Sequence, residues 1–137
     1  MEINECINFL LSRAQRNVFQ CLKSELSEFN VTPAQYGVLK CLWGKESQTP
    51  KQIADVLGLD GSTITGILDR MEVKDLIRRA GNPQDRRTLK VIVTEKGSKL
   101  QKSTEKIVDR VNNYMLEIFT DDEQKQLKKF LKLIAKR

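Results

Sequence analysis

Hydrophobic residues recur at every third or fourth position through the first thirty residues, a spacing that predicts one long amphipathic helix. Its apolar stripe is formed by Ile3, Ile7, Leu10, Leu11, Ala14, Val18, Cys21, Leu22 and Leu26. The same spacing returns in the last third of the chain and predicts a helix capped by Thr94 and another capped by Thr120. Their apolar faces carry Leu100, Ile107, Val108, Val111, Met115 and Ile118 in the first, and Leu127, Phe130, Leu131 and Ile134 in the second. We expect the apolar face of the second of these helices to point inward.

Three shorter helices are expected between these long ones. The segments 32–35 and 49–52 both contain a threonine, a proline and, two residues after the proline, a glutamine. Threonine caps a helix, proline fits its first turn and glutamine reaches back to the cap, so each segment begins a helix. Gly44 and Gly58 are of the residue type that commonly ends a helix. A further helix is predicted from about residue 60 to residue 75.

The periodicity changes after this helix. Residues 89–93 form a run rich in β-branched side chains that is typical of a strand, and residues 77–79 are a shorter candidate partner. Between them, residues 80–88 contain Gly, Asn, Pro and Asp, which hairpin loops use. The chain is therefore predicted to be one mainly α-helical domain with about six helices and a small β-hairpin.

The two short helices before the hairpin have the spacing of a helix-turn-helix. Ala54 is small enough for two crossing helices to approach closely, and Gly58 can adopt the left-handed conformation that ends the first of them. Ile64 and Ile67 fall on the inner face of the second helix. Any tight helical hairpin could share these features, so DNA binding and simple packing both remain open at this point.

The outer face of the second helix carries small hydrogen-bonding groups near its N-terminus. The residues on this face are Ser62, Thr63, Thr65, Gly66, Asp69 and Arg70. Such a face fits a major groove about 12 Å wide, and a helix N-terminus attracts phosphate. We expect all of these residues except Asp69 to contact DNA. Ordinary helix capping is the alternative for Ser62.

Composition narrows the classes of function. The 137 residues carry a net charge of +6 and contain no histidine, the commonest general base and metal ligand. We therefore expect neither an enzyme nor a metal or cofactor site. The sequence contains no run of about 18 apolar residues and no signal peptide, so we expect a cytoplasmic protein without a membrane partner. The cysteines Cys6, Cys21 and Cys41 are widely spaced and are expected to be free thiols.

Positive charge is concentrated in the predicted hairpin. Residues 78–90 carry Arg78, Arg79, Arg86, Arg87 and Lys90 against Asp85 alone. Such a cluster beside turn-forming residues favours a phosphate-binding element. Arginine suits a narrow minor groove, and Asp85 can hold one arginine by a charge-assisted hydrogen bond, with a solvated salt bridge as the alternative. The C-terminal lysines alternate with acids and are expected to form a solvated helix face.

Together these motifs resemble the MarR family of bacterial transcription regulators. The resemblance rests on the Thr-Pro-x-Gln helix start, Ser-Thr-x-Thr, Asp-Arg-Met, Asn-Pro-x-Asp-Arg-Arg and Val-Thr-Glu-Lys-Gly. It implies a winged helix-turn-helix in which residues 30–95 form the DNA-binding lobe, while residues 1–29 and 96–137 form dimerisation helices. It further implies a homodimeric, sequence-specific repressor that binds a pseudo-palindromic operator in double-stranded DNA.

The same resemblance assigns roles to single residues of the hairpin, which is the wing of this fold. It implies that Arg87 enters the minor groove, that Asp85 orients it and that Arg86 contacts a phosphate. Gly66 departs from the family, many of whose members carry a larger side chain there, so one base contact is lost. The apolar faces of the first helix and of residues 98–135 are longer than a small winged-helix core can cover, which independently favours a dimer.

Release from DNA by a small molecule is a further implication of the resemblance. Family members are often released by small aromatic or phenolic anions that bind between the dimer helices and the DNA-binding lobe. Arg13, Arg16, Tyr36 and Trp43 could line such a pocket here. An aromatic core with surface arginines is the alternative for these residues.

Two other interpretations stay open. One subgroup of the family senses organic hydroperoxides through a cysteine near the start of the first helix, where Cys6 lies. The aromatic-rich pattern of that subgroup is absent, because Cys6 is flanked by Glu5 and Ile7, and the acidic neighbour disfavours a thiolate. The other interpretation is a winged-helix module that binds proteins and not DNA.

Overall fold

The computed structural model describes the backbone of residues 1–82 and 85–137, and the side chains outside residues 82–88. Its helices are α1 (Ile7–Leu26), α2 (Pro33–Gly44), α3 (Pro50–Leu57), α4 (Gly61–Val73), α5 (Glu95–Lys99), α6 (Gln101–Leu116) and α7 (Asp121–Lys136). Two short 3-10 helices, η1 (Ile3–Glu5) and η2 (Ser27–Phe29), flank α1. The strands are β1 (Ser47–Gln48), β2 (Ile77–Asn82) and β3 (Asp85–Val93). None of the helices in the described chain combines the length and the apolar character needed to span a bilayer.

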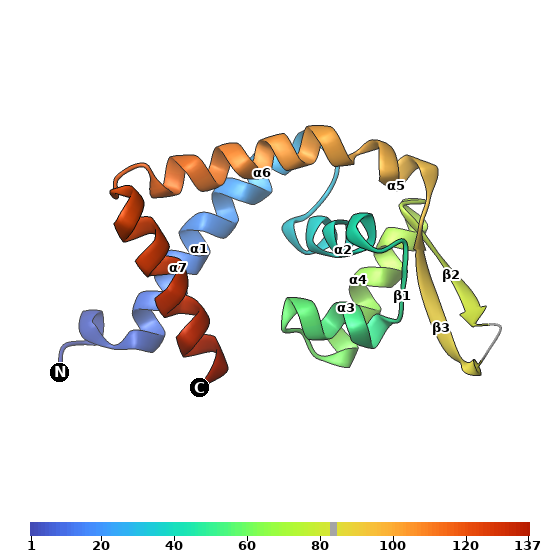
Figure 1. Ribbon diagram of the computed structural model, residues 1–137, viewed down its shortest axis with the longest axis horizontal. Helices are drawn as coiled ribbons and strands as arrows, with labels where there is room; N and C mark the ends of the chain where they lie inside the picture. Colours follow the sequence, from blue (N-terminus) through green and yellow to red (C-terminus); the bar gives the residue numbers. More distant parts are fainter. Residues whose placement is uncertain (83–84) are drawn as a thin grey trace.

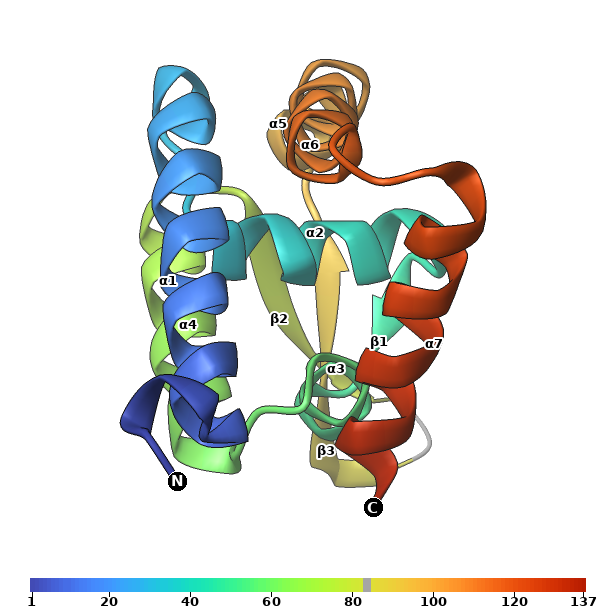
Figure 2. The ribbon, with the colours of Figure 1, turned by 90° about the vertical axis from the view of Figure 1, so that its left-hand side faces the viewer.

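The elements form a lobe and an arm (Figure 1). The lobe is residues 31–100, which include α2 to α5 and the sheet; the arm is α1, α6 and α7 with the two 3-10 helices. α6 extends away from the lobe, and α7 turns back from its far end. α1 packs against α6, whereas α1 and α7 lie apart on opposite sides of α2 in Figure 2. The two ends of the chain therefore both belong to the arm.

The sheet has three antiparallel strands in the order β1-β3-β2. The hairpin register pairs Ile77 with Val93, and β1 adds the pair Gln48–Val91. β1 was not predicted because two residues are too few to show alternation. β2 and β3 also extend into the predicted loop, because their pairing continues outward beyond the apolar run that marked the strands.

An apolar core fills the lobe. It consists of Val31, Val38, Leu39, Leu42, Ile53, Ala54, Ile64, Ile67, Leu68, Met71, Leu76, Ile77 and Val91. Most of these residues come from α2, α3, α4 and the sheet, while Val31 precedes α2 and Leu76 precedes β2, and they include the inward positions expected of a helix-turn-helix. Burying one aliphatic side chain contributes about 1.5–3 kcal/mol, so this core holds α3 and α4 together within the lobe.

The arm, in contrast, leaves most of its apolar residues exposed. Within the described chain, α7 has no buried residue and α1 buries only Leu26. The prediction that the apolar face of α7 points inward is wrong for the single chain, since Phe130 is 53% exposed and Ile134 48%. Ile118 lies beyond the end of α6 and is 79% exposed. The pattern identified the apolar face correctly, but no other element in the described part of the chain buries it.

The predicted fold class is confirmed as mainly α-helical with a small β-hairpin, and two helix predictions change in detail. The first helix is interrupted, because Cys6 is extended and caps α1, while Asn30 adopts a left-handed conformation after η2. The helix predicted after Thr94 is divided into α5 and α6, which meet at Leu100. The described chain therefore contains seven α-helices where the pattern predicted about six.

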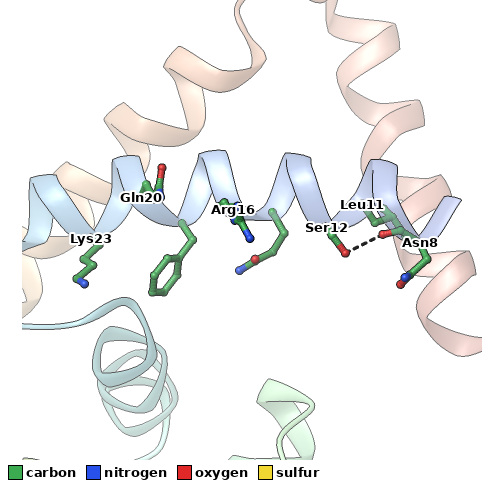
Figure 3. Close-up of a pocket in the computed structure, with 8 residues that line it drawn as sticks. Asn8, Leu11, Ser12, Arg16, Gln20 and Lys23 are labelled. Atoms are coloured by element: carbon green, nitrogen blue, oxygen red, sulfur yellow. Dashed lines mark hydrogen bonds between the residues drawn. The ribbon is translucent and has the colours of Figure 1, made fainter. Parts of the chain in front are cut away.

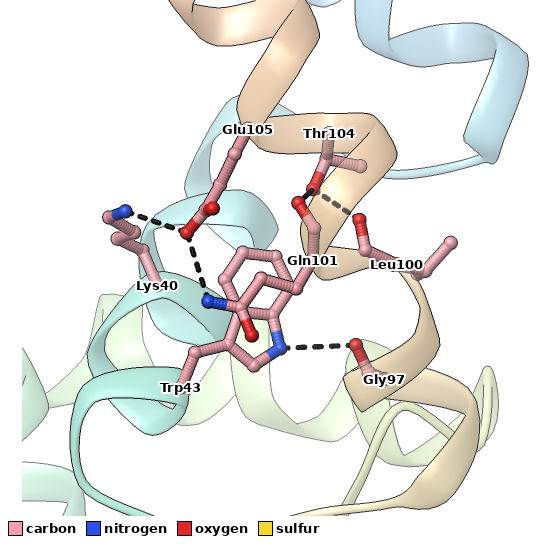
Figure 4. A network of polar contacts seen from close by, with 7 residues as sticks. All are labelled: Lys40, Trp43, Gly97, Leu100, Gln101, Thr104 and Glu105. Carbon is pink, nitrogen blue, oxygen red and sulfur yellow. Dashed lines mark hydrogen bonds and ion pairs between the residues drawn. The ribbon is translucent and has the colours of Figure 1, made fainter.

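Polar contacts join α2 to α5 and α6 where the arm leaves the lobe (Figure 4). Nζ of Lys40 lies 2.7 Å from Oε1 of Glu105, which also accepts from Nε2 of Gln101 at 3.1 Å. This contact raises the pKa of Lys40 and lowers the pKa of Glu105. Nε1 of Trp43 donates to the carbonyl oxygen of Gly97 at 3.2 Å. These bonds link α2 to the segment from which the arm extends.

Candidate nucleic-acid interface

The turn between α3 and α4 is set by its local sequence. Gly58 has a left-handed backbone with a φ of 68°, as predicted, and its N–H donates to the carbonyl oxygen of Ala54. A residue with a Cβ would be strained in this conformation. Ala54 is only 5% exposed and lies in the core that α3 shares with α4. The turn therefore fixes the angle at which α4 is presented.

Asp60 caps α4 and is a residue of the candidate interface that the sequence reasoning missed. Its Oδ1 accepts from the backbone N–H of Thr63 at 2.7 Å and from Oγ of Ser62 at 2.9 Å. The hydrogen bond from the Thr63 backbone is the main reason that the pKa of Asp60 is lowered. Ser62 is thus bound to the capping side chain, while its own position remains exposed. An aspartate directly before a helix was the available signal.

The next turn of α4 presents Thr65, Gly66 and Arg70. Oγ1 of Thr65 donates to the carbonyl oxygen of Gly61 at 2.8 Å, which leaves its lone pairs free to accept. The side chain of Arg70 folds back over Gly66, because a Cβ placed on Gly66 would lie 3.6 Å from Nη1 of Arg70. The space left by the missing side chain of Gly66 is therefore next to a guanidinium group that can face DNA.

The predicted contact residues of α4 share one accessible face. Ser62, Thr63, Thr65 and Arg70 are exposed and Gly66 is half-buried. In both ribbon views, the beginning of α4 and the outer ends of β2 and β3 lie at the same edge of the molecule (Figures 1 and 2). A single straight ligand along this edge can thus reach the helix and the hairpin together.

The predicted contacts at the outer end of the hairpin lie outside the described side chains. The backbone of Asp85, Arg86 and Arg87 belongs to β3. Their roles, including the orienting contact between Asp85 and Arg87, remain predictions.

Arg79 of β2 has a different partner from the one its sequence context suggested. It was grouped with arginines that seek phosphate, but Nε lies 2.9 Å from Oε2 of Glu72 and Nη2 bonds to Oδ1 of Asp69. Both carboxylates belong to α4, so Arg79 joins the hairpin to the helix. The bond to Asp69 is the main reason that the pKa of Arg79 is raised.

Lys74 connects the end of α4 to the start of α2. Its Nζ donates to the carbonyl oxygen of Asn30 and to Oε1 of Gln35, both at 2.9 Å. Burial is the main reason that the pKa of Lys74 is lowered. Nζ of Lys96 in turn donates to the carbonyl oxygen of Lys74 at 2.8 Å. Four segments of the chain therefore meet at the C-terminal end of α4.

The four residues predicted to line an effector pocket fall into two pairs. Arg13 and Arg16 line a hollow of about 290 Å³ on α1, together with apolar residues such as Phe9 and Leu10. Arg16 also lines a more open hollow of about 740 Å³ along the same helix (Figure 3). Its other lining residues are Asn8, Leu11, Ser12, Gln15, Phe19, Gln20 and Lys23. The arginines thus lie on an accessible surface of the arm.

The aromatic pair is held in a different place. The rings of Tyr36 and Trp43 pack edge to face with their centroids 5.9 Å apart. Burial is the main reason that the pKa of Tyr36 is raised. Among the described residues, neither aromatic side chain lines the two hollows that contain the arginines. The structure therefore favours a packing role for this pair, as part of the joint between lobe and arm.

The cysteines are free thiols, as predicted, and all three are partly accessible. Cys6 is not inside a helix with Cys21, because it is the extended residue that caps α1.

Comparisons with known proteins place these features in a family context. Residues 31–89 match the family model described as MarR family. The chain is 34% identical to the organic hydroperoxide resistance transcriptional regulator of Bacillus subtilis (strain 168), over 96% of this chain and 88% of the relative. It superposes on a mutant MarR from E. coli complexed with operator DNA with a TM-score of 0.88 and 27% identity, covering 98% and 99% of the two chains. The repressor CouR bound to a 23-mer DNA duplex matches with a TM-score of 0.89 and 30% identity, over 98% and 95%.

Proposed function

This chain belongs to the MarR family of transcription regulators, and on that basis we propose that it is a homodimeric repressor that reads a specific double-stranded operator. DNA-binding regulation of transcription, with no enzymatic role, follows from membership of the family. Homodimerisation, repression and the roles of single residues go beyond it and belong to the proposal. We expect the protein to act in the cytoplasm.

One observation carries the proposal. The exposed polar face at the beginning of α4 and the outer ends of β2 and β3 occupy the same edge of the lobe (Figures 1 and 2). A helix in the major groove and a hairpin in the flanking minor groove require this arrangement. The likeness to two structures that contain bound DNA supports the same orientation.

We propose that α4 recognises base sequence in the major groove, whereas the hairpin recognises the shape of the minor groove. Thr65 and Arg70 of α4 face base edges in the major groove, while Ser62, Thr63 and the open position at Gly66 allow the helix to enter deeply. Arg87 enters the minor groove, oriented by Asp85, and Arg86 binds a phosphate. Two copies of this lobe read two half-sites about one helical turn apart, so the operator is pseudo-palindromic.

The proposed dimer is supported by the exposed apolar residues of the arm. Ile7 and Leu10 of α1 and Phe130 and Ile134 of α7 are each more than 40% exposed in the single chain. Apolar patches of this kind mark interaction surfaces. We propose that residues 1–29 and 96–137 cover one another across the dimer and leave residues 30–95 as the DNA-binding region.

Binding to duplex DNA as a function of salt tests the proposal. Operator duplexes are first selected from a random DNA pool, and the association constant is then measured between 50 and 300 mM salt. Each phosphate that the protein neutralises contributes about −0.9 to the slope of log K against log salt, so we expect a slope of several units. Absence of selected duplexes together with a flat salt dependence would overturn DNA binding and favour a protein-interaction module.

Two substitutions test the hairpin and α4 separately within that experiment. Arg87→Ala is expected to weaken binding to all duplexes by about 10- to 100-fold, because a charge-assisted hydrogen bond is lost. Thr65→Ala is expected to relax preference at one base position by about 1–3 kcal/mol. Unchanged affinity of a folded Arg87→Ala protein would show that the minor-groove assignment is wrong.

Release by a small aromatic or phenolic anion is part of the proposal. Arg13 and Arg16 supply the cations beside apolar side chains at the hollow on α1, so we now assign the anion to them and not to Tyr36 or Trp43. Titration of operator-bound protein with aromatic carboxylates tests this assignment. Loss of the response in Arg13→Ala/Arg16→Ala, with operator affinity unchanged in the absence of anion, is the expected result.

Oxidation sensing by Cys6 is a second candidate. It is favoured by the relative from Bacillus subtilis named for organic hydroperoxide resistance and by the free, partly accessible thiol at the start of α1. Peroxide should then release the operator from the wild-type protein and not from Cys6→Ser. Equal responses of the two proteins would eliminate this candidate.

A further inference from the structure

α4, the helix that we propose enters the major groove, carries an excess of negative charge in a protein that is otherwise basic. α4 contains Asp69 and Glu72 against Arg70 alone, although the whole chain has a net charge of +6. Asp69 follows Gly66 by three positions and Thr65 by four, so it shares their face of the helix. Its side chain is 60% exposed. An unpaired carboxylate on this face would repel DNA, which carries one negative charge for each 1.7 Å of its axis.

Among the residues whose side chains the structure describes, Arg79 contacts both carboxylates. The guanidinium group of Arg79 bonds to Asp69 through Nη2 and to Glu72 through Nε, the latter at 2.9 Å. The Arg79 side chain is 22% exposed, whereas the side chains of Asp69 and Glu72 are 60% and 48% exposed, so both ion pairs lie at the surface. The planar fork of arginine can serve two acceptors at once, which a lysine ammonium on the same strand would do less well.

The ion pairs of Arg79 also link β2 to α4, two elements that must approach DNA together. Arg79 lies in β2, opposite Val91 of β3, and both acceptors lie on α4. The outer part of the same hairpin is the wing. The position of Asp69 relative to the DNA-facing residues of α4 is therefore controlled from the base of the wing.

We propose that Arg79 is a positioning residue of the DNA-binding site, which holds Asp69 and Glu72 of α4 and cancels their charge so that the helix can approach phosphate. This inference rests on the proposed DNA-binding function. In this role Arg79 does not contact DNA itself. Arg79 acts through the two carboxylates, so replacing one carboxylate by a neutral side chain compensates for the loss of Arg79.

The test is a set of charge-matched variants measured on a duplex selected with the wild-type protein. Arg79→Met removes the Arg79 cation from both carboxylates and is expected to raise the dissociation constant about tenfold at 0.1 M salt, with a smaller effect at higher salt, where charges are screened. Arg79→Met/Asp69→Asn restores the local net charge and is expected to return the affinity to within about threefold of wild type. Arg79→Met/Asp122→Asn has the same net charge but removes a carboxylate from α7, and it should bind as weakly as Arg79→Met.

Several outcomes would overturn the inference. If Arg79→Met binds as well as wild type, the carboxylates do not need a partner. If Arg79→Met/Asp69→Asn stays as weak as Arg79→Met, Arg79 itself contacts DNA or its link between β2 and α4 is what matters. Urea unfolding of each variant separates these results from a folding defect, and Arg79→Lys, which keeps the charge, provides a conservative variant expected to bind within about threefold of wild type.

Failure of the inference and failure of the proposed function give different results. If wild-type protein selects no duplex and shows no salt-dependent binding, DNA binding itself is wrong. If wild-type protein binds with a steep salt dependence and only the rescue by Asp69→Asn fails, the function stands and the role of Arg79 is overturned.

Discussion

The lobe and the arm use apolar residues in opposite ways. The lobe encloses its core so completely that Val38, Leu39 and Leu42 of α2 are each 0% exposed. The arm has equally regular apolar stripes, yet α7 contains no buried residue. A regular hydrophobic pattern therefore predicts which face of a helix is apolar, but it does not predict whether another element of the same chain buries that face.

This difference agrees with the division of labour that we propose. A lobe that binds DNA has to keep the same shape before and after binding, and a closed core provides that stability. A dimerisation arm has to leave an apolar surface for a second copy. Each of the following substitutions tests one side of this comparison or the joint between the two regions.

The largest effect is expected from a cavity in the lobe. Leu42→Ala should lower the free energy of unfolding by about 2–5 kcal/mol, since the side chain is fully buried. Leu133→Ala on α7 removes the same atoms from a side chain that is 56% exposed, so it should weaken self-association more than folding. Urea unfolding measures the first effect and sedimentation equilibrium the second. An equal loss of unfolding free energy in both variants would contradict the comparison.

The next effect is expected from a charge placed on the arm. Phe130→Asp should disrupt the proposed dimer and weaken operator binding about 100-fold, because two linked lobes gain effective concentration that one lobe lacks. Gln126→Asp is the matched control, since it adds the same charge at an exposed position of the same helix. Gel-shift titration of both proteins gives the comparison. A monomeric Phe130→Asp protein with full operator affinity would remove the arm from the mechanism.

A smaller effect is expected at Gly97 of α5, in the part of the lobe from which the arm extends. A Cβ there would lie 2.8 Å from Cγ2 of Val93 and would also clash with the carbonyl oxygen of Leu76. Gly97→Ala should therefore destabilise the fold by about 1–3 kcal/mol. Gly44→Ala is the control, because a Cβ at Gly44 has no described neighbour within 4 Å. Thermal unfolding should separate the two variants clearly, and identical melting temperatures would argue against a tight joint.

The smallest effect is expected from the ion pair between Lys40 and Glu105. Because the pKa of Glu105 is lowered in the folded protein, the pair stabilises the fold above the unfolded-state value of about 4.3. That contribution is lost as the pH falls through the lowered folded value. Glu105→Gln should therefore cost less than about 1 kcal/mol at pH 7 and nothing near pH 3. Urea unfolding at the two pH values is the measurement, and a loss that persists at pH 3 would point to packing instead of charge.

Much of the fold could be predicted because its signals are local. Thr32 and Thr49 cap α2 and α3 in the predicted capping boxes, and Gly58 has the predicted left-handed backbone. Such features depend on hydrogen bonds within a few residues. The helix-turn-helix and the exposed face of α4 followed from these signals and from the period of the apolar residues.

The predictions that changed depended on contacts between distant residues. Arg79 was grouped with Arg78 and Arg86 by sequence, but its partners lie on α4, seven and ten residues earlier. Trp43 was considered for a ligand pocket, but its indole N–H is used by Gly97, fifty-four residues later. β1 forms only because β3 passes beside it. None of these partners can be read from spacing along the chain.

Local chemistry in the chain was thus enough to specify where α2 and α3 begin and where α3 ends, which faces are apolar and which short helix offers polar groups to a groove. Those properties follow from backbone hydrogen bonding and side-chain periodicity, which act over one or two turns. The folded arrangement was needed to show that Arg79 meets the acids of α4, that the aromatic pair packs in the joint, and that the apolar stripe of α7 stays uncovered. These depend on which surfaces meet in three dimensions, because charge pairing and burial are properties of contacts and not of sequence intervals.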